Sequence, residues 1–141
     1  MPVAQFLVDV SAWVRYPDPA VGARLDELGA AGLLATCGIT ELQLLAGLHD
    51  AGTYATVATL RQQAYPVLVL SEADVQRALE VQGLLVAGGA LGVPWSVLLV
   101  AAIAERHGVM VLHGGRWFDL VARVTGQGME RVEIPSGYAR R

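Results

Sequence analysis

Five short runs of mostly apolar residues, separated by longer stretches, set the strongest limit on how this chain can fold. Four of the five runs contain at most one charged residue, which is typical of strands that are buried on both faces. Such strands belong to parallel sheets covered by helices, so the pattern predicts an α/β fold with a central parallel sheet. The runs are QFLVDV at 5–10, LLATC at 33–37, PVLVL at 66–70, VMVLH at 109–113 and MERVEI at 129–134.

The stretches between the runs have the spacing and the end signals of helices. Asp18 precedes Pro19 in the order expected of an N-cap and a first helical residue. Ser71 and Asp74 resemble a capping box, with Asp in place of the usual Glu or Gln. We therefore predict helices within 18–32, 40–52, 53–65, 71–88, 96–108 and 116–126.

Residues 81–104 contain no charged side chain and are long enough to span a bilayer. Glycines and a proline interrupt this stretch at Gly88, Gly89, Gly92 and Pro94, which favours two shorter buried helices. The N-terminal segment lacks the basic region of a signal peptide. We expect a cytoplasmic protein that does not enter the membrane, and the single cysteine, Cys37, is consistent with a reducing compartment.

Length and charge limit the classes of function. A chain of 141 residues suits one domain, which we place at 1–135, followed by a disordered tail at 136–141. The net charge is −3, so no overall positive field indicates nucleic-acid binding. The chain contains no lysine, and any contact with RNA would have to use arginines.

Two carboxylates are expected at the edge of the sheet where parallel strands end. Asp9 ends the first apolar run, and Glu41 lies in the mostly apolar segment GITELQLLAG. Each has a structural explanation: Asp9 as an N-cap, and Glu41 as a first-turn acid in a helix capped by Thr40 or Thr36. Together, two isolated acids at one edge form a better candidate metal site than either alone.

Other polar residues give weaker signals. His49, His107 and His113 lack metal-ligand spacing, and we expect them at the surface or at helix ends. Arg15 and Arg116 are candidates for RNA contact, although scattered solvating arginines are the alternative.

Five segments together resemble PIN-domain proteins of the VapC toxin type, particularly those of actinobacteria. The resemblance implies a three-layer α/β/α PIN-like fold and the activity of a Mg²⁺- or Mn²⁺-dependent RNA endonuclease. It also implies a homodimer, and a cognate VapB-like antitoxin that covers the active-site groove. The segments are FLVDVSAW, TELQLLAG, ALEVQGLLVAGG, LLVAAIAERHGVMVLH and FDLVARVTGQGMERV.

The family's metal site consists of four acidic positions, two of which are retained here. The resemblance places the first at Asp9, with Ser11 as its usual neighbour, and the second at Glu41, next to Thr40. These residues are the expected catalytic and metal-binding acids.

The other two acidic positions are lost. Val97 occupies the third position and Gly115 the fourth, while Trp117 replaces an aspartate that is common two residues later. A nuclease of this type needs the metal to hold phosphate and to activate water, so we expect reduced or absent activity. The alternatives are a catalytically inactive PIN-fold protein that binds antitoxin, RNA or another PIN chain, and an α/β domain whose two acids are structural.

Overall fold

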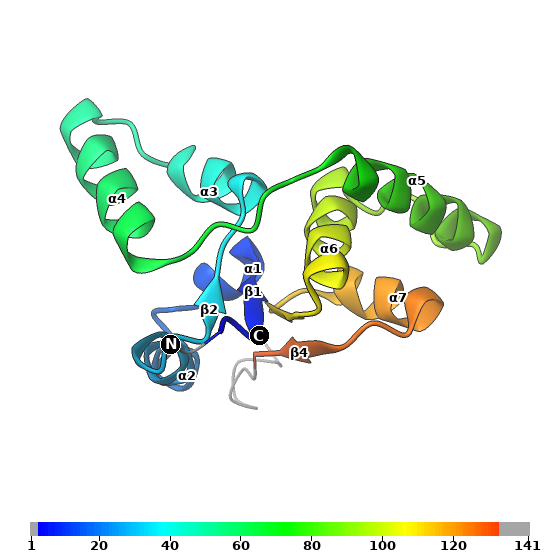
Figure 1. Ribbon diagram of the computed structural model, residues 1–141, viewed down its shortest axis with the longest axis horizontal. Helices are drawn as coiled ribbons and strands as arrows, with labels where there is room; N and C mark the ends of the chain where they lie inside the picture. The colour runs from blue at the N-terminus through cyan, green and yellow to red at the C-terminus, as the bar shows by residue number, and fades with distance from the viewer. Residues whose placement is uncertain (1–2, 133–141) are drawn as a thin grey trace.

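The computed structural model describes residues 3–132 (Figure 1). The predicted domain boundary at 135, the tail at 136–141 and the end of the last apolar run lie outside these residues.

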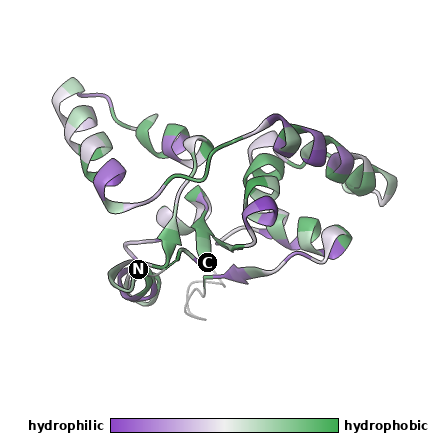
Figure 2. Ribbon diagram, in the orientation of Figure 1, coloured by the Kyte–Doolittle hydropathy of each residue, from purple (hydrophilic) through white to green (hydrophobic). Residues whose placement is uncertain are grey.

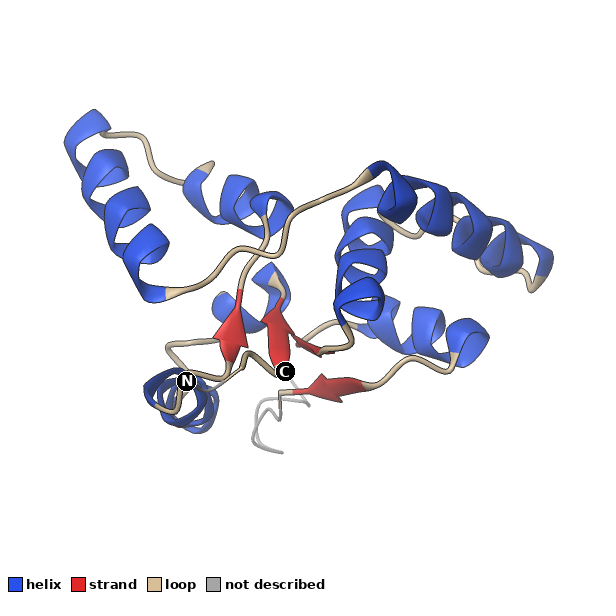
Figure 3. Ribbon diagram, viewed as in Figure 1, coloured by secondary structure: helices blue, strands red, loops and turns tan. Residues whose placement is uncertain are grey.

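A four-stranded parallel sheet forms the centre of the structure, as predicted (Figure 3). Its strand order is β2-β1-β3-β4, so β1 and β3 occupy the middle. Leu7 of β1 lies opposite Ala35 of β2 on one side and Val111 of β3 on the other. The strands are β1 (Phe6–Val8), β2 (Leu34–Ala35), β3 (Met110–His113) and β4 (Met129–Arg131).

The prediction of a strand at 66–70 is wrong. This segment makes a single parallel bridge, between Val67 and Thr36, at the edge of the sheet. The partner strand β2 is only two residues long and turns into a helix at Gly38, so little extended chain is available for pairing. Val69 and Leu70 consequently remain exposed.

Seven helices connect and cover the strands in the described part of the chain. All six predicted helical stretches are confirmed, and a short helix after β1 was not predicted. The helices are α1 (Val10–Trp13), α2 (Pro19–Ala30), α3 (Gly38–Leu45), α4 (Ala51–Ala64), α5 (Glu72–Ala87), α6 (Trp95–His107) and α7 (Arg116–Thr125).

The predicted helix ends have the expected chemistry. Asp18 accepts hydrogen bonds from the backbone at the start of α2, and Ser71 and Asp74 form the capping box of α5. Gly108 ends α6 in the left-handed conformation, which glycine adopts without steric cost. The uncharged stretch 81–104 is broken between α5 and α6, and no helix within 3–132 is long and apolar enough to cross a membrane.

Two hydrophobic cores, one on each face of the sheet, produce the three layers. Leu7 and Val111 contribute to the larger core, together with residues of α5, α6 and α7. Phe6 and Leu112, the neighbours of these residues in each strand, contribute to the second core against α1 and α2. Because side chains alternate between the faces of a strand, each central strand supplies both cores. The α/β/α architecture is therefore confirmed.

Helix α4 differs from the other long helices because none of its side chains is buried. It projects from the body of the molecule next to α3 (Figure 1). In Figure 2, α6 is mostly hydrophobic, whereas α4 is pale and becomes hydrophilic towards its C-terminal end. Contacts with the hydrophobic core therefore do not determine the position of α4.

Candidate functional site

Asp9 lies at the carboxyl end of β1 and is only 5% exposed. It is the N-cap of α1, and its Oδ2 accepts a hydrogen bond of 2.9 Å from the backbone N–H of Ser11. The Ser11 hydroxyl in turn accepts a hydrogen bond of 3.0 Å from the backbone N–H of Gly114. Asp9 therefore has the capping role weighed in the sequence, at the junction between β1 and the turn after β3.

Glu41 lies in the first turn of α3, where a carboxylate interacts favourably with the helix dipole. Arg61 of α4 donates from Nε to Oε1 at 2.7 Å and from Nη2 to Oε2 at 3.0 Å. The hydroxyl of Thr36 also donates to Oε2, at 2.5 Å. Both oxygens of Glu41 are thus occupied by side chains of this chain.

Neither threonine caps α3, so that part of the sequence interpretation is wrong. Cys37 is the N-cap and makes no capping bond through its side chain. Thr40 is fully buried, with its hydroxyl 3.6 Å from the sulfur of Cys37. Burial raises the pKa of the Cys37 thiol, which therefore remains neutral. Thr40 supports the local packing, and within residues 3–132 the side-chain partners of Glu41 are Thr36 and Arg61.

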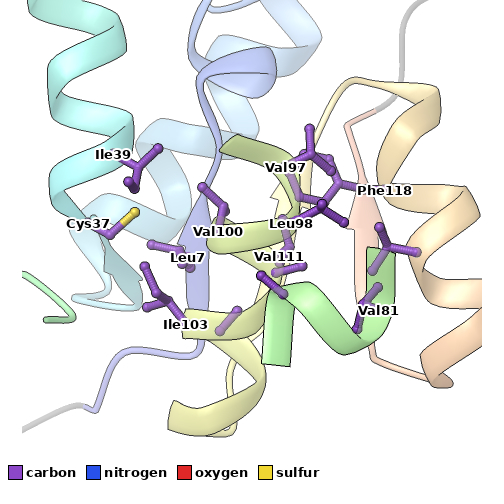
Figure 4. Close-up of a cluster of buried hydrophobic side chains, with 14 of the residues drawn as sticks. Leu7, Cys37, Ile39, Val81, Val97, Leu98, Val100, Ile103, Val111 and Phe118 are labelled. Atoms are coloured by element: carbon purple, nitrogen blue, oxygen red, sulfur yellow. The ribbon is translucent and has the colours of Figure 1, made fainter. Parts of the chain in front are cut away.

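Val97 belongs to the apolar interior, and Trp117 packs against that interior from a partly exposed position. Val97, in the first turn of α6, is 8% exposed and belongs to the larger core. Figure 4 draws it together with Leu98 and Phe118 of the same cluster. Trp117 is partly buried against this core as well. The two positions therefore contribute apolar packing where the resemblance led us to expect carboxylates.

Gly115 is the N-cap of α7 and offers no side-chain cap. A Cβ atom placed there would meet the Ser11 side chain at 3.8 Å, an ordinary contact distance. At the preceding Gly114, a Cβ atom would lie 2.7 Å from the Ser11 carbonyl oxygen. The turn after β3 therefore has room for a side chain at one of its two glycines.

The two arginines considered for RNA contact lie on either side of this turn. Arg15 donates from Nη1 to the carbonyl of Ser11, so its guanidinium is held against the end of α1. Arg116 is exposed, and its guanidinium carbon lies 4.7 Å from the centre of the Trp117 ring. Their positions at the sheet edge agree with the hypothesis, but RNA contact itself stays a prediction.

The expectation that all three histidines lie at the surface or at helix ends is wrong for His113. His113 ends β3 and is 1% exposed. Its Nδ1 accepts a hydrogen bond from the Gly115 backbone, and its Nε2 lies 3.8 Å from Asp119. Burial lowers the pKa of His113, against the opposing effect of Asp119. A strand-end position within an apolar run was the sequence signal for this burial.

Arg61 is the residue that the sequence interpretation missed. It is the only charged residue between Asp50 and Glu72, just as Glu41 is isolated in an apolar helix. The signal in the sequence for an ion pair was that Glu41 and Arg61, of opposite charge, are each isolated in one of two consecutive predicted helices.

The side chains at this edge do not fit a metal centre of four acids. Within residues 3–132, no three His, Cys, Asp or Glu side chains are grouped closely enough to hold an ion. Asp9 and Glu41 remain, but both oxygens of Glu41 face the guanidinium of Arg61. Asp119 of α7 pairs with Arg131 at 3.0 Å.

Comparisons with known proteins identify relatives over nearly the whole chain. Ribonuclease VapC21 of Mycobacterium tuberculosis is 35% identical over 134 residues, which cover 93% of this chain and 96% of the relative. Ribonuclease VapC51 of the same organism is 32% identical, with 94% and 96% covered. No family model matches the sequence.

Solved structures show the same fold at low sequence identity. The DNA-bound VapBC complex of Salmonella typhimurium contains a chain that matches with a TM-score of 0.74 at 16% identity, over 93% of this chain and all of the other. The promoter-bound VapBC2 complex of Rickettsia felis gives a TM-score of 0.73 at 13% identity, with 91% and 98% covered.

Proposed function

This chain belongs to the VapC family of ribonucleases, and we propose that it is the toxin-type subunit of a toxin–antitoxin pair whose own ribonuclease activity is reduced or lost. The observation that carries the proposal is the state of the acidic site. Asp9 and Glu41 remain, Val97 and Gly115 provide no carboxylate, and Arg61 neutralises Glu41.

The two retained acids support weak metal binding at most. Mg²⁺ keeps several of its waters and is often bound through one or two carboxylates, and Mn²⁺ accepts the same oxygen ligands. Asp9 is buried and uses one oxygen to cap α1, while Glu41 is paired with an arginine. Val97 adds apolar surface, which disfavours a hydrated ion.

The partner that we propose is a VapB-like antitoxin. Two of the matching solved structures are VapBC complexes bound to DNA, and a VapBC-1 structure of Haemophilus influenzae matches as well. Co-expression with a VapB-type antitoxin is expected to yield one complex in size-exclusion chromatography, and separate elution would contradict this assignment.

RNA cleavage tests the proposed loss of activity. A pool of structured RNA is incubated with Mn²⁺ and one of four proteins. These are the parent, Asp9→Asn, Gly115→Asp, and the double variant that combines Gly115→Asp with Val97→Asp. We expect the parent and Asp9→Asn to leave the RNA intact, and restored acids to increase cleavage. An active VapC ribonuclease serves as the positive control.

Cleavage by the parent but not by Asp9→Asn would show that two acids suffice, and the proposal would be wrong. If restored variants that fold still do not cut, the alternative function gains support: a PIN-fold protein that binds antitoxin, RNA or another PIN chain without catalysis. The apolar environment of Val97 and Trp117 is the observation that favours this alternative.

A further inference from the structure

Helix α4 places a cation on Glu41, one of the two acids retained at the candidate site. We propose that Arg61 is an internal inhibitor: its guanidinium occupies both oxygens of Glu41 and keeps a divalent ion from binding there. The inference rests on the proposed function in one respect, namely that Asp9 and Glu41 are the remains of a metal site. It adds a residue of this chain that controls access to that site.

The ion pair between Arg61 and Glu41 has bidentate geometry. Arg61 presents two parallel N–H groups to the two carboxylate oxygens, at 2.7 and 3.0 Å. This bidentate arrangement is the strongest form of an ion pair between side chains. The two side chains are 15% and 20% exposed, so water screens the pair less than it screens a surface pair.

Two aromatic rings fix the guanidinium in place. Its carbon lies 4.8 Å from the ring centre of Trp13 and 5.2 Å from that of Tyr65. The two rings are themselves in contact, with centres 5.4 Å apart. Trp13 is the last residue of α1, and Asp9 is the N-cap of the same helix. The contact between the Arg61 guanidinium and the Trp13 ring therefore connects α4 to the helix whose N-cap is the other retained acid.

The placement of α4 supports the same conclusion. The helix buries no side chain, and Arg61 is its only charged residue. The contacts that connect α4 to the rest of the molecule include the ion pair of Arg61 with Glu41, and the contact of the C-cap residue Tyr65 with Trp13. Because Arg61 is one of the contacts that hold α4 in place, its guanidinium stays against the carboxylate of Glu41.

A guanidinium and a divalent ion need the same oxygens. An ion that binds Glu41 must first break two charge-assisted hydrogen bonds, while Thr36 continues to donate to one oxygen. Water and the ion itself replace part of what these contacts contribute, so we expect a net cost of about 1.4 kcal/mol, which lowers the affinity for the ion about tenfold.

Mn²⁺ binding tests this inference without reference to catalysis. The affinity of the full chain for Mn²⁺ is measured by titration calorimetry and by the electron paramagnetic resonance signal of unbound Mn²⁺. We expect Arg61→Gln to bind Mn²⁺ about tenfold more tightly than the parent. Combining it with Glu41→Gln is expected to remove the gain.

Arg24→Gln is the matched control. Arg24 also pairs bidentately with a glutamate, Glu130, at 3.1 and 3.0 Å, and lies over the ring of Phe6. Its removal changes the net charge equally but leaves Glu41 untouched, so no gain in Mn²⁺ affinity is expected. Arg61→Lys keeps the charge and loses the bidentate geometry, and its affinity should lie between those of the parent and Arg61→Gln.

Equal Mn²⁺ affinity in the parent and in folded Arg61→Gln, including no binding by either, would overturn the inference. A gain of the same size in Arg24→Gln would overturn it too, because net charge would then be the cause. If Arg61→Gln does not fold, Arg61→Lys decides, and an affinity no higher than the parent's refutes the inference. RNA cleavage by the parent would refute only the proposed loss of activity.

Discussion

At the scale of single residues, the two glycines after β3 differ in what surrounds them. A Cβ atom at Gly114 would lie 2.7 Å from the Ser11 carbonyl oxygen and equally close to the Arg15 guanidinium. The corresponding atom at Gly115 meets the Ser11 side chain at 3.8 Å. The close approach of α1 to this turn therefore requires glycine at the first position only.

We predict opposite outcomes for substitutions at the two glycines. Gly114→Ala should destabilise the protein by about 2 kcal/mol, because the backbone of the turn must move away from Ser11. Gly115→Asp should be neutral or stabilising by a few tenths of a kcal/mol, since Asp is a favourable N-cap for α7. Urea unfolding measures both, and equal losses would contradict the contrast.

The residue scale is also where sequence interpretation was least complete. Asp9 and Glu41 stood out because each is an isolated acid near a predicted strand end, and the structure places both around the end of β1 and β2. Arg61 did not stand out, because it lies twenty residues from Glu41 and only the folded chain brings the two together. The assignment of Asp9 and Glu41 as metal ligands stays a prediction.

At the scale of elements, patterns that depend on neighbouring residues predicted the structure well. The caps of α2 and α5 and the end of α6 follow from residues within one helical turn. The apolar run at 66–70 has strand composition but only one bridge partner, Thr36. Strand formation needs a partner of sufficient length, and the composition of a segment cannot supply that information.

The capping box of α5 gives a prediction about pH. Asp74 is 1% exposed; burial raises its pKa, but hydrogen bonds from Arg106 and Ser71 outweigh this effect, so the net pKa lies below the ordinary value. A carboxylate with a lowered pKa stabilises the fold at pH values above its unfolded pKa of about 3.9, and this contribution disappears as the pH falls through the folded pKa.

Asp74→Asn should therefore lower the free energy of unfolding by about 2 kcal/mol at neutral pH, because it weakens both the cap and the contact with Arg106. The difference from the parent should shrink below about pH 4, where the aspartate is protonated in the unfolded chain. Urea unfolding across pH tests this, with Glu72→Gln in the same turn as the control. A constant difference down to pH 2 would count against it.

At the scale of the whole molecule, several large apolar side chains on α5 and just beyond it are exposed. Leu79, Leu84 and Val86 of α5, with Leu91 and Trp95 beyond it, are between 49% and 69% exposed. Large apolar side chains that are exposed on a folded domain are candidates for burial in an interface. The resemblance to VapC toxins implies a homodimer, and this surface is our candidate for the contact.

We predict that the isolated chain is a dimer in size-exclusion chromatography with light scattering. Trp95→Glu should shift the mass to that of a monomer, because a charge in an apolar contact is costly. Val14→Glu, at an exposed apolar residue outside this group, should leave the dimer intact. A monomeric parent would refute the dimer, and a dimeric Trp95→Glu would refute this choice of surface.

The burial of Val97 and Trp117 also bears on how the family lineage of this chain can change. Both side chains now pack against the larger core, so each contributes to the stability of the fold. Returning a carboxylate to position 97 would place a charge in an apolar environment and cost on the order of several kcal/mol. A single change of Val97 to an acid would therefore destabilise the fold. If position 97 held an acid, as the resemblance implies, its present neighbours in the core would have to change before a carboxylate fitted there again, whereas position 115 has no such requirement.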